Sequence, residues 1–233
     1  MQLESLSWFP GHMTKTRRMV ASEIGSMDAV CEIIDAICGT KPRMIILNRI
    51  DMADPAMTKR WAEHFRAKGY AVLESDAKSG VGTAKFAGAV RELLADKLRA
   101  YEEKGQVGRV LRVMVLGIPN VGKSTFINKV SGRKTAKAED RPGVTRGKQW
   151  VPVDKTLELL DTPGILWPKF EDPNVGVRLG FTGAIRDDVM DMEDLASRLM
   201  AYLGAHYPDA LTERYKIAVE PGEPGWGVAF MRA

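Results

Sequence analysis

The chain has 233 residues, which allows one full domain and a smaller partner. Hydrophobic residues make up 45% and charged residues 27%, a globular composition that excludes a wholly disordered chain. Lys and Arg outnumber Asp and Glu by 34 to 30, a balance that permits a nucleic-acid partner without establishing one.

The apolar runs stop short of the ~20 residues that a membrane helix needs, and residues 1–10 lack the uninterrupted apolar stretch of a secretory signal. Two cysteines, Cys31 and Cys38, cannot build a disulfide framework or a four-ligand zinc site. We therefore expect a cytoplasmic protein without a membrane span.

Residues 1–20 form a basic arm with Trp8 and Phe9 near its tip. Short apolar runs then predict strands over residues 29–34, 43–47, 70–73, 107–116, 150–153 and 157–160. Helical patterns cover residues 55–68, 83–103 and 123–130, and the pattern turns helical again after Gly176. Strands that alternate with helices predict an α/β fold with a mostly parallel sheet covered on both faces. The last two strands are expected to pair as a hairpin around Asp154–Lys155.

The segment Gly117–Ser124 matches the phosphate-loop pattern G-x-x-x-x-G-K-[ST], between a predicted strand and a predicted helix. Its glycines let backbone N–H groups turn toward a phosphate, and the helix N-terminus adds positive potential. Lys123 is expected to reach the β- and γ-phosphates and Ser124 to bind Mg²⁺. A chance Gly-rich turn is the alternative. The nucleotide-contacting residues predicted here are Asn120, Val121, Gly122, Lys123, Ser124 and Thr125.

Two further segments follow predicted strands and suit a purine base. In Asn48-Arg49-Ile50-Asp51, the carboxylate of Asp51 can accept hydrogen bonds from guanine N1–H and the exocyclic amine, a donor pair that adenine lacks. Charge-assisted hydrogen bonds of about 1.5–3 kcal/mol each would select GTP over ATP. The loop Ser75-Asp76-Ala77-Lys78 is small enough for its backbone to touch the guanine carbonyl. An Asx turn closing a strand is the alternative interpretation of the first segment.

A metal site is indicated by Asp161-Thr162-Pro163-Gly164, which ends a predicted strand. Asp161 would hold Mg²⁺ through water, and the N–H of Gly164 would sense the γ-phosphate. Thr145, between the phosphate-loop helix and the hairpin, could close over the metal. An ordinary turn and a surface loop are the respective alternatives. The joint occurrence favours the nucleotide interpretation, because each element supplies chemistry that the others lack.

The order of these elements resembles that of the circularly permuted GTPases, in particular the ribosome biogenesis GTPase A (YlqF/RbgA) family. The usual order begins with the phosphate loop, whereas here Asn48–Asp51 and Ser75–Lys78 precede it. The segments 8–13 (WFPGHM) and 164–170 (GILWPKF) also match the family, and the likeness covers most of residues 8–215. It implies a circularly permuted P-loop GTPase domain over residues 21–173 after the arm 1–20. A small C-terminal helical domain, 174–233, looks shorter than the family's.

The resemblance implies a GTP-binding, GTP-hydrolysing ribosome assembly factor that uses GTP/GDP and Mg²⁺. Its expected partners are the large ribosomal subunit and its rRNA, with no DNA. Basic clusters at Lys15–Arg18 and Arg133–Lys137 fit an RNA contact, although solvated basic faces are commoner. A metabolic P-loop kinase or ATPase, and a GTP-binding scaffold without hydrolysis, are the competing interpretations.

Catalysis needs a separate account, because Ile165 stands where switch GTPases carry a water-positioning Gln. The resemblance points to His12 as the group that orients or deprotonates water, with Lys123 and Thr145 completing the catalytic set. A helix-capping or RNA-facing His12 is the alternative. Asn120 resembles a phosphate-loop Asn that helps bind K⁺ in related GTPases, and a solvent-facing turn residue is the alternative for it.

Two features depart from the family. Arg49 stands where the family has Lys, and an Arg stem can still lie along the base. The strands 29–35 and 43–47 should be parallel neighbours, yet only Ala36–Pro42 would connect them, and a parallel crossover usually needs a dozen or more residues. Either residues are missing between Ala36 and Ile37, or the topology differs there.

Overall fold

A computed structural model describes residues 11–32, 41–133, 148–166 and 172–216. The chain divides into two compact units, one of residues 9–166 and one that combines residues 1–8 with 167–233. The domain limits expected from the sequence, 1–20, 21–173 and 174–233, remain a prediction.

Within the described residues, the first unit is built around one six-stranded sheet. Its strands lie side by side in the order β3-β2-β1-β4-β6-β5. Its neighbours are parallel except for the antiparallel hairpin of β5 and β6. This confirms the predicted α/β fold with a mostly parallel sheet. The strands are β1 (Ala29–Glu32), β2 (Arg43–Leu47), β3 (Ala71–Glu74), β4 (Leu111–Val115), β5 (Gln149–Asp154) and β6 (Leu157–Asp161).

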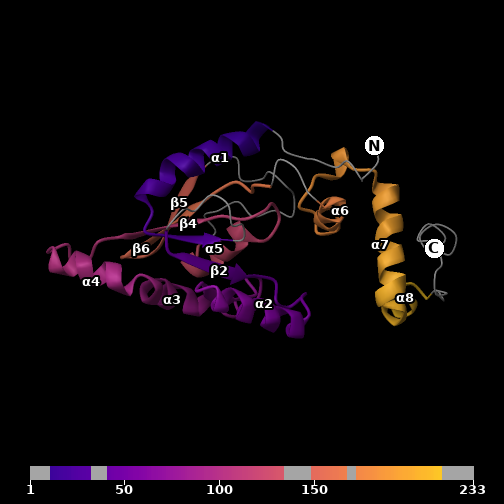
Figure 1. Ribbon diagram of the computed structural model, residues 1–233, viewed down its shortest axis with the longest axis horizontal. Coiled ribbons are helices and arrows are strands. Elements are labelled where there is room, and N and C mark those ends of the chain that lie inside the picture. The colour runs from indigo at the N-terminus through magenta and orange to yellow at the C-terminus, as the bar shows by residue number, and fades with distance from the viewer. Residues whose placement is uncertain (1–10, 33–40, 134–147, 167–171, 217–233) are drawn as a thin grey trace. The chain divides into compact units, whose positions relative to one another are not determined.

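Helices cover both faces of this sheet, and Figure 1 shows α1 on one side and α2, α3 and α4 on the other. Alternate side chains of β4 point to opposite faces, as the strand geometry requires. Val113 packs in the core with Phe86 of α3 and Phe126 of α5, whereas Met114 packs with Val20 of α1. The helices of this unit are α1 (Gly11–Glu23), α2 (Pro55–Ala67), α3 (Phe86–Leu93), α4 (Ala95–Glu103) and α5 (Lys123–Ser131), with 3₁₀ turns η2 (Ile24–Ser26) and η3 (Thr83–Lys85).

Two predicted elements are wrong in their extent. The helix expected over residues 83–103 is η3, α3 and α4, which break at Leu94 (φ −106°, ψ 15°). No Gly or Pro marks that break, and Leu94 is buried in the core, so tertiary packing sets it. The strand expected over 107–116 starts only at Leu111, because residues 107–110 form an exposed turn with Gly108 at φ +76°.

The parallel pairing of β1 with β2 is confirmed, with Val30 opposite Arg43 and Cys31 opposite Met44. Residues 33–42 join the two strands, and 33–40 of these lie outside the described residues. The topology therefore does not differ at this point from the expected one.

The carboxyl ends of β2, β3, β4 and β6 lie at one edge of the sheet, because these strands run parallel. Asn48 follows β2, Ser75 follows β3, Gly117 lies two residues after β4, and Asp161 ends β6. Ligands of open α/β sheets bind at this edge. The fold thus brings the singled-out segments to one place.

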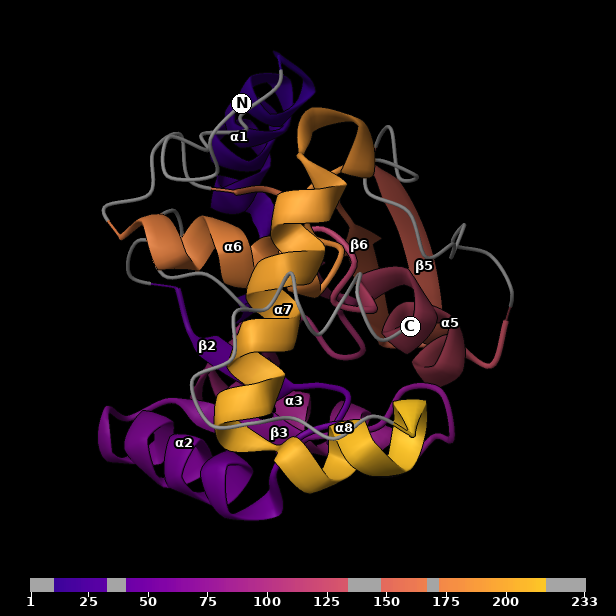
Figure 2. The same cartoon turned by 90° about the vertical axis from the view of Figure 1, so that its right-hand side faces the viewer.

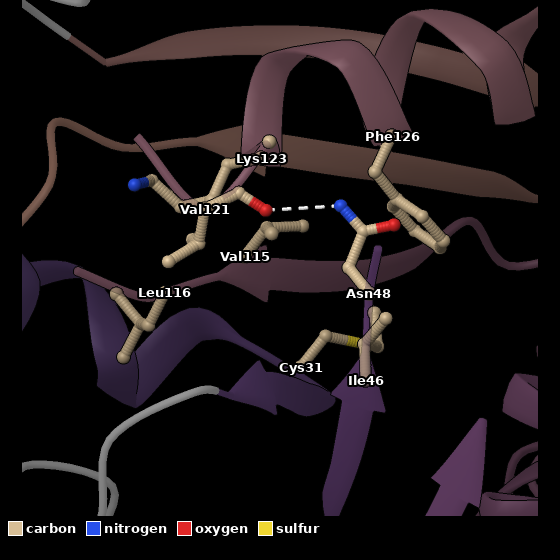
Figure 3. Close-up of a pocket in the computed structure, with 9 residues that line it drawn as sticks. Cys31, Ile46, Asn48, Val115, Leu116, Val121, Lys123 and Phe126 are labelled. Carbon is tan, nitrogen blue, oxygen red and sulfur yellow. Dashed lines mark hydrogen bonds between the residues drawn. The ribbon is translucent and has the colours of Figure 1, made fainter. Parts of the chain in front are cut away.

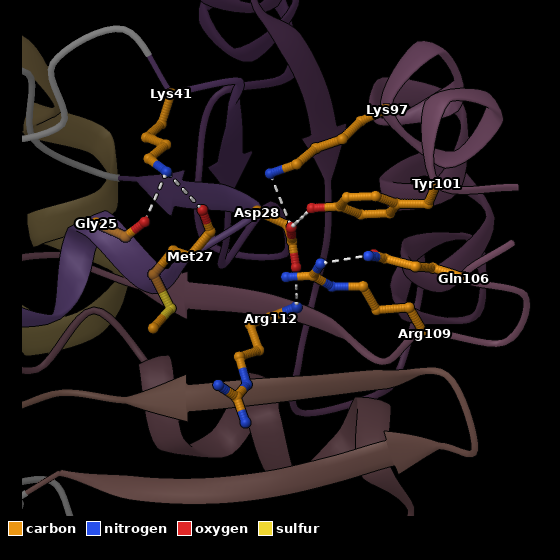
Figure 4. A network of polar contacts seen from close by, with 9 residues as sticks. All are labelled: Gly25, Met27, Asp28, Lys41, Lys97, Tyr101, Gln106, Arg109 and Arg112. Carbon is orange, nitrogen blue, oxygen red and sulfur yellow. Dashed lines mark hydrogen bonds and ion pairs between the residues drawn. The ribbon is translucent and has the colours of Figure 1, made fainter. Parts of the chain in front are cut away.

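At the opposite end of the sheet, a buried carboxylate, Asp28, lies just before β1 and accepts several hydrogen bonds (Figure 4). Its Oδ1 accepts hydrogen bonds from Lys97 Nζ at 2.8 Å and Tyr101 Oη at 2.9 Å, and its Oδ2 accepts one from the Arg112 backbone N–H at 2.8 Å. Burial would raise the pKa of Asp28, but these donors outweigh it and lower the pKa. The carboxylate therefore contributes stability at neutral pH, and this contribution is lost as the pH falls through its lowered pKa.

The second unit contains helices α6 (Pro173–Phe181), α7 (Met192–His206) and α8 (Pro208–Tyr215), with the 3₁₀ turn η4 (Asp187–Val189). The carboxylate of Asp191 caps α7 by accepting from the N–H groups of Glu193 and Asp194. Leu211 of α8 packs against Met200 and Leu203 of α7. Figure 2 shows α8 directly after the lower end of α7. The helical pattern expected after Gly176 is confirmed. Within the described residues, no helix combines the length and apolarity needed to cross a membrane.

Candidate functional site

The phosphate loop leads from β4 directly into α5, as the sequence predicts. Asn120 and Gly122 both have left-handed backbone conformations, with φ of 60° and 87°. Gly122 is the residue preceding α5 and has no side chain that could cap the first turn. The amide groups of that turn and the helix dipole therefore favour an anion at this end of α5.

Lys123 is buried in the loop that precedes it, with 9% of its surface exposed. Its Nζ donates to the carbonyl oxygens of Gly117 at 3.1 Å and Ile118 at 2.8 Å. Burial lowers the pKa of Lys123 to about 8, and the nearby carboxylate of Asp161 opposes that shift. A polyphosphate would compensate the buried ammonium with negative charge.

Asn48 links three segments that are distant in the sequence, and Figure 3 shows its contact with Val121. Its Nδ2 donates to the carbonyl of Val121 at 2.9 Å. Its Oδ1 accepts from the hydroxyl of Ser75 and from the backbone N–H of Ala77, both at 3.1 Å. The phosphate loop and the two predicted base-reading loops therefore share one side chain. This contact goes beyond an Asx turn that only closes β2.

Gly122 is needed for that contact. A Cβ built on Gly122 would lie 2.6 Å from Asn48 Nδ2, whereas one on Gly132, also left-handed at φ +65°, would meet nothing within 4 Å. We expect Gly122→Ala to lower the free energy of unfolding by about 2–3 kcal/mol, from backbone strain plus loss of the Asn48 bridge, and Gly132→Ala by about 1 kcal/mol from strain alone. Urea denaturation of both variants measures the difference, and equal losses would contradict the bridge.

The base-reading loops differ in how their polar side chains are used. Asp76 closes its own turn, since its carboxylate accepts from the N–H groups of Lys78 at 2.9 Å and Ser79 at 3.2 Å. Asp51 is exposed, in the turn after β2. Arg49 has φ of 59°, an uncommon conformation for a residue with a side chain. A base at this edge can therefore meet the Asp51 carboxylate and the backbone of Ser75–Ala77.

Asp161 and Ser124 form the metal-binding half of the site. Ser124 Oγ donates to Asp161 Oδ2 at 3.0 Å, and Asp161 is fully buried. Its Oδ1 is a buried oxygen without a hydrogen-bond partner among the described residues. Burial raises the pKa of Asp161, and the Ser124 hydroxyl and Lys123 oppose that shift. A cation would supply what this oxygen lacks.

Asp161–Gly164 is packed tightly against the phosphate loop. A Cβ on Gly164 would lie 2.6 Å from Pro119 Cα, and the N–H of Ile165 donates to the carbonyl of Gly117 at 3.1 Å. The side chain of Ile165 is 6% exposed and packs in the core with Val20. Ile165 therefore points away from the site, in keeping with the expectation that it does not orient water.

Two predicted site residues are not placed by the structure. His12 lies in α1, but its side chain is outside the described part, and Thr145 is outside the described residues altogether. The sequence did not indicate the carbonyl oxygens that accept hydrogen bonds from Lys123 and Asn48. They are main-chain oxygens of Gly117, Ile118 and Val121, and any residue type would supply them. Sequence reasoning also missed buried Thr162, whose hydroxyl donates to Val115 O at 2.7 Å.

Comparison with known proteins agrees with this geometry. A family model described as "50S ribosome-binding GTPase" matches residues 112–201, which start in β4. Asn48–Asp51 and Ser75–Lys78 precede that match, in keeping with a permuted order.

The relatives carry consistent names. The chain is 44% identical over 227 residues to ribosome biogenesis GTPase A of Priestia megaterium, covering 91% of this chain and 79% of that protein. It is 29% identical to the mitochondrial ribosome-associated GTPase 1 of Mus musculus, over 94% of this chain and 73% of that one. The crystal structure of GNP-bound YlqF from T. maritima has the same fold, with a TM-score of 0.57 at 21% identity, over 93% of this chain and 91% of that one. At this identity and coverage, the chain belongs to the ribosome biogenesis GTPase A family.

Proposed function

We propose that this GTP-binding, GTP-hydrolysing assembly factor acts on the large ribosomal subunit and its rRNA, with its nucleotide held between Gly117–Ser124, Asn48–Asp51 and Asp161–Gly164. The observation that carries the nucleotide assignment is the Asn48 side chain, which contacts both Val121 and Ala77. A metabolic kinase or ATPase would have no use for that link. The 50S description of the matching family model supports the choice of subunit.

The base and the phosphates have separate partners in this proposal. Asp51 accepts from guanine N1–H and the exocyclic amine, and the backbone of Ser75–Ala77 faces the guanine carbonyl. Lys123 leaves its carbonyl acceptors for the β- and γ-phosphates, because a charged oxygen is the stronger acceptor. Gly164 packs closely against Pro119 of the phosphate loop, and its N–H is the group proposed to contact the γ-phosphate.

Magnesium fits the residues at the end of β6. The buried Asp161 Oδ1 lacks a partner among the described residues, and the Ser124 hydroxyl is next to it. These are the hard oxygen donors that Mg²⁺ takes together with waters and phosphate oxygens. Among the described residues no group of three or more His, Cys, Asp or Glu gathers. When bound, Mg²⁺ supplies charge neutralisation of the phosphates, and Thr145 remains its third proposed ligand.

Ile165 is turned into the core and cannot orient water, and the resemblance to the family is what points to His12 for water activation. Potassium beside Asn120 remains a prediction, and the left-handed φ of Asn120 fits a turn residue equally well.

We expect His12→Ala to lower ribosome-stimulated GTP turnover by about a hundredfold, the contribution typical of a positioned general base. Single-turnover hydrolysis measures the change, with GTP affinity expected to stay at the wild-type value. Unchanged turnover would remove His12 from the mechanism.

Lys123 makes nucleotide binding depend on pH. Its pKa of about 8 in the free protein should rise when polyphosphate binds, because the phosphates stabilise the ammonium form. Below pH 8 the ammonium is already present, and above it binding must take up a proton. We expect GDP affinity to fall by about tenfold from pH 7 to pH 9. Calorimetry at pH 8 in buffers of different ionisation enthalpy should show net proton uptake, and net release would contradict the assignment.

Co-sedimentation with purified large ribosomal subunits tests the function itself. We expect association with a non-hydrolysable GTP analogue and much weaker association with GDP. Lys123→Ala should associate weakly with large subunits whether GDP or the GTP analogue is added. Small ribosomal subunits serve as the control particle. Association that ignores the nucleotide, or equal affinity for ATP and GTP, would refute the proposal.

A further inference from the structure

Helix α2 carries an exposed stripe with mixed aromatic and basic character. Its members recur at helical spacing and are Met57, Arg60, Trp61 and His64 of the helix and its C-cap residue Lys68, called here the α2 stripe. Trp61 is 50% exposed and Met57 43% exposed, and Arg60, His64 and Lys68 are also exposed. The helix buries a different face, on which Ala62 is fully covered. Packing against the sheet therefore does not explain the stripe.

The indole of Trp61 is held by two neighbouring rings, Phe65 beside the stripe and His64 within it. The Trp61 and Phe65 ring centroids lie 5.7 Å apart at an interplanar angle of 28°, and the His64 ring meets Trp61 edge-on at 5.5 Å. Arg60 Nη1 lies 3.7 Å from Met57 Sδ, along the same face. These contacts hold the half-exposed indole in place, so it offers a preformed flat surface at low entropic cost.

The charges around the indole favour a polyanion. Arg60 and Lys68 flank it, whereas Glu63 lies off the stripe and Glu74 is paired with Arg66 at 3.1 Å. The carboxylate of Asp54 is used as the helix N-cap, where it accepts from the Ala56 N–H. Exposed cations beside a half-exposed aromatic ring are the combination that binds unpaired nucleotides, since phosphates pair with the cations and a base stacks on the ring.

We propose that the α2 stripe binds single-stranded RNA, with one unpaired base stacked on Trp61 and its flanking phosphates on Arg60 and Lys68. This inference rests on the proposed function, because it names the surface through which the factor would contact rRNA. Figure 1 places α2 on the side of the sheet opposite α1. The stripe is therefore separate from the basic residues Lys15–Arg18 in α1.

Fluorescence anisotropy with a labelled oligouridylate of about 12 nucleotides tests the proposal directly. We expect Trp61→Ala to weaken binding by about tenfold and Trp61→Phe to retain most of it, because stacking survives with a smaller ring. The double variant Arg60→Gln, Lys68→Gln should reduce the slope of log K against log salt by about 1.4, for two lost phosphate contacts. Lys104→Gln with Lys155→Gln removes two exposed charges elsewhere and should leave the slope unchanged.

Guanine-nucleotide affinity and thermal melting check that each variant is folded. If Trp61→Ala is unstable, the salt dependence of the Arg60→Gln, Lys68→Gln variant still tests the proposal. Wild-type RNA affinity in both stripe variants would overturn the proposal. Normal RNA affinity together with lost sedimentation on large subunits would assign the stripe to a protein partner instead. The assay contains no ribosome and no GTP. RNA binding through the stripe without any subunit association would therefore refute the proposed function alone.

Discussion

Replacing Lys123 by Ala should reduce triphosphate affinity by about a thousandfold. The ammonium is proposed to make charge-assisted hydrogen bonds to two phosphates, each worth roughly 1.5–3 kcal/mol, and a loss of about 4 kcal/mol corresponds to that factor. Binding of a fluorescent GTP analogue measures it. Lys129→Ala is the matched control, because Lys129 is an exposed lysine on the same helix, α5, and should bind as the wild type does.

The size of the Lys123 effect also tests the site as a whole. Lys123 contacts the phosphate loop through Gly117, and Asn48 contacts the same loop through Val121. A phosphate bound by Lys123 must therefore lie at the carboxyl ends of the strands. Intact triphosphate binding in Lys123→Ala would refute the phosphate-loop assignment. A loss shared equally by guanosine, which has no phosphates, would instead indicate a damaged fold.

Asp51→Asn should lower GTP affinity by about 300-fold and create affinity for xanthosine triphosphate. The carboxylate accepts from two guanine donors, and an amide replaces one acceptor with a donor that faces the guanine amine. Xanthine carries a carbonyl oxygen in place of that amine, so the amide of the variant can donate to it. Competition binding with GTP, ATP and xanthosine triphosphate measures the switch.

Glu63→Gln is the control for this switch, since it neutralises another exposed carboxylate close by in the sequence and should leave the nucleotide preference unchanged. A general loss of affinity for all three nucleotides in Asp51→Asn would mean that the loop has been disturbed. Unaltered GTP preference would show that Asp51 does not read the base.

The sheet and the convergence of the site were predictable because they depend on local patterns. The phosphate-loop motif, the short apolar runs and the polar residues that follow them specify parallel strands whose carboxyl ends carry Asn48, Ser75, Gly117 and Asp161. Parallel geometry alone then brings these residues to one edge. The predicted strand 43–47 matches β2, and the hairpin of β5 and β6 forms as expected.

What the sequence could not supply comes from tertiary packing. The break at Leu94 follows from burial of that side chain rather than from a helix-breaking residue. The Asn48 contact with Val121 uses a main-chain oxygen, which any residue could provide. Trp61 and Arg60 look like ordinary members of an amphipathic helix until the structure shows which side of α2 is covered. The individual roles of Asp51, His12 and Thr145 stay predictions.

The amide of Asn48 also bears on how the pocket fills. Its hydrogen bonds to Val121, Ser75 and Ala77 are made within the protein, so they align the loops proposed for the base with the phosphate loop. An entering nucleotide loses little free energy to ordering them, and capture should be fast. The time that a spent diphosphate stays bound is then set by its own contacts.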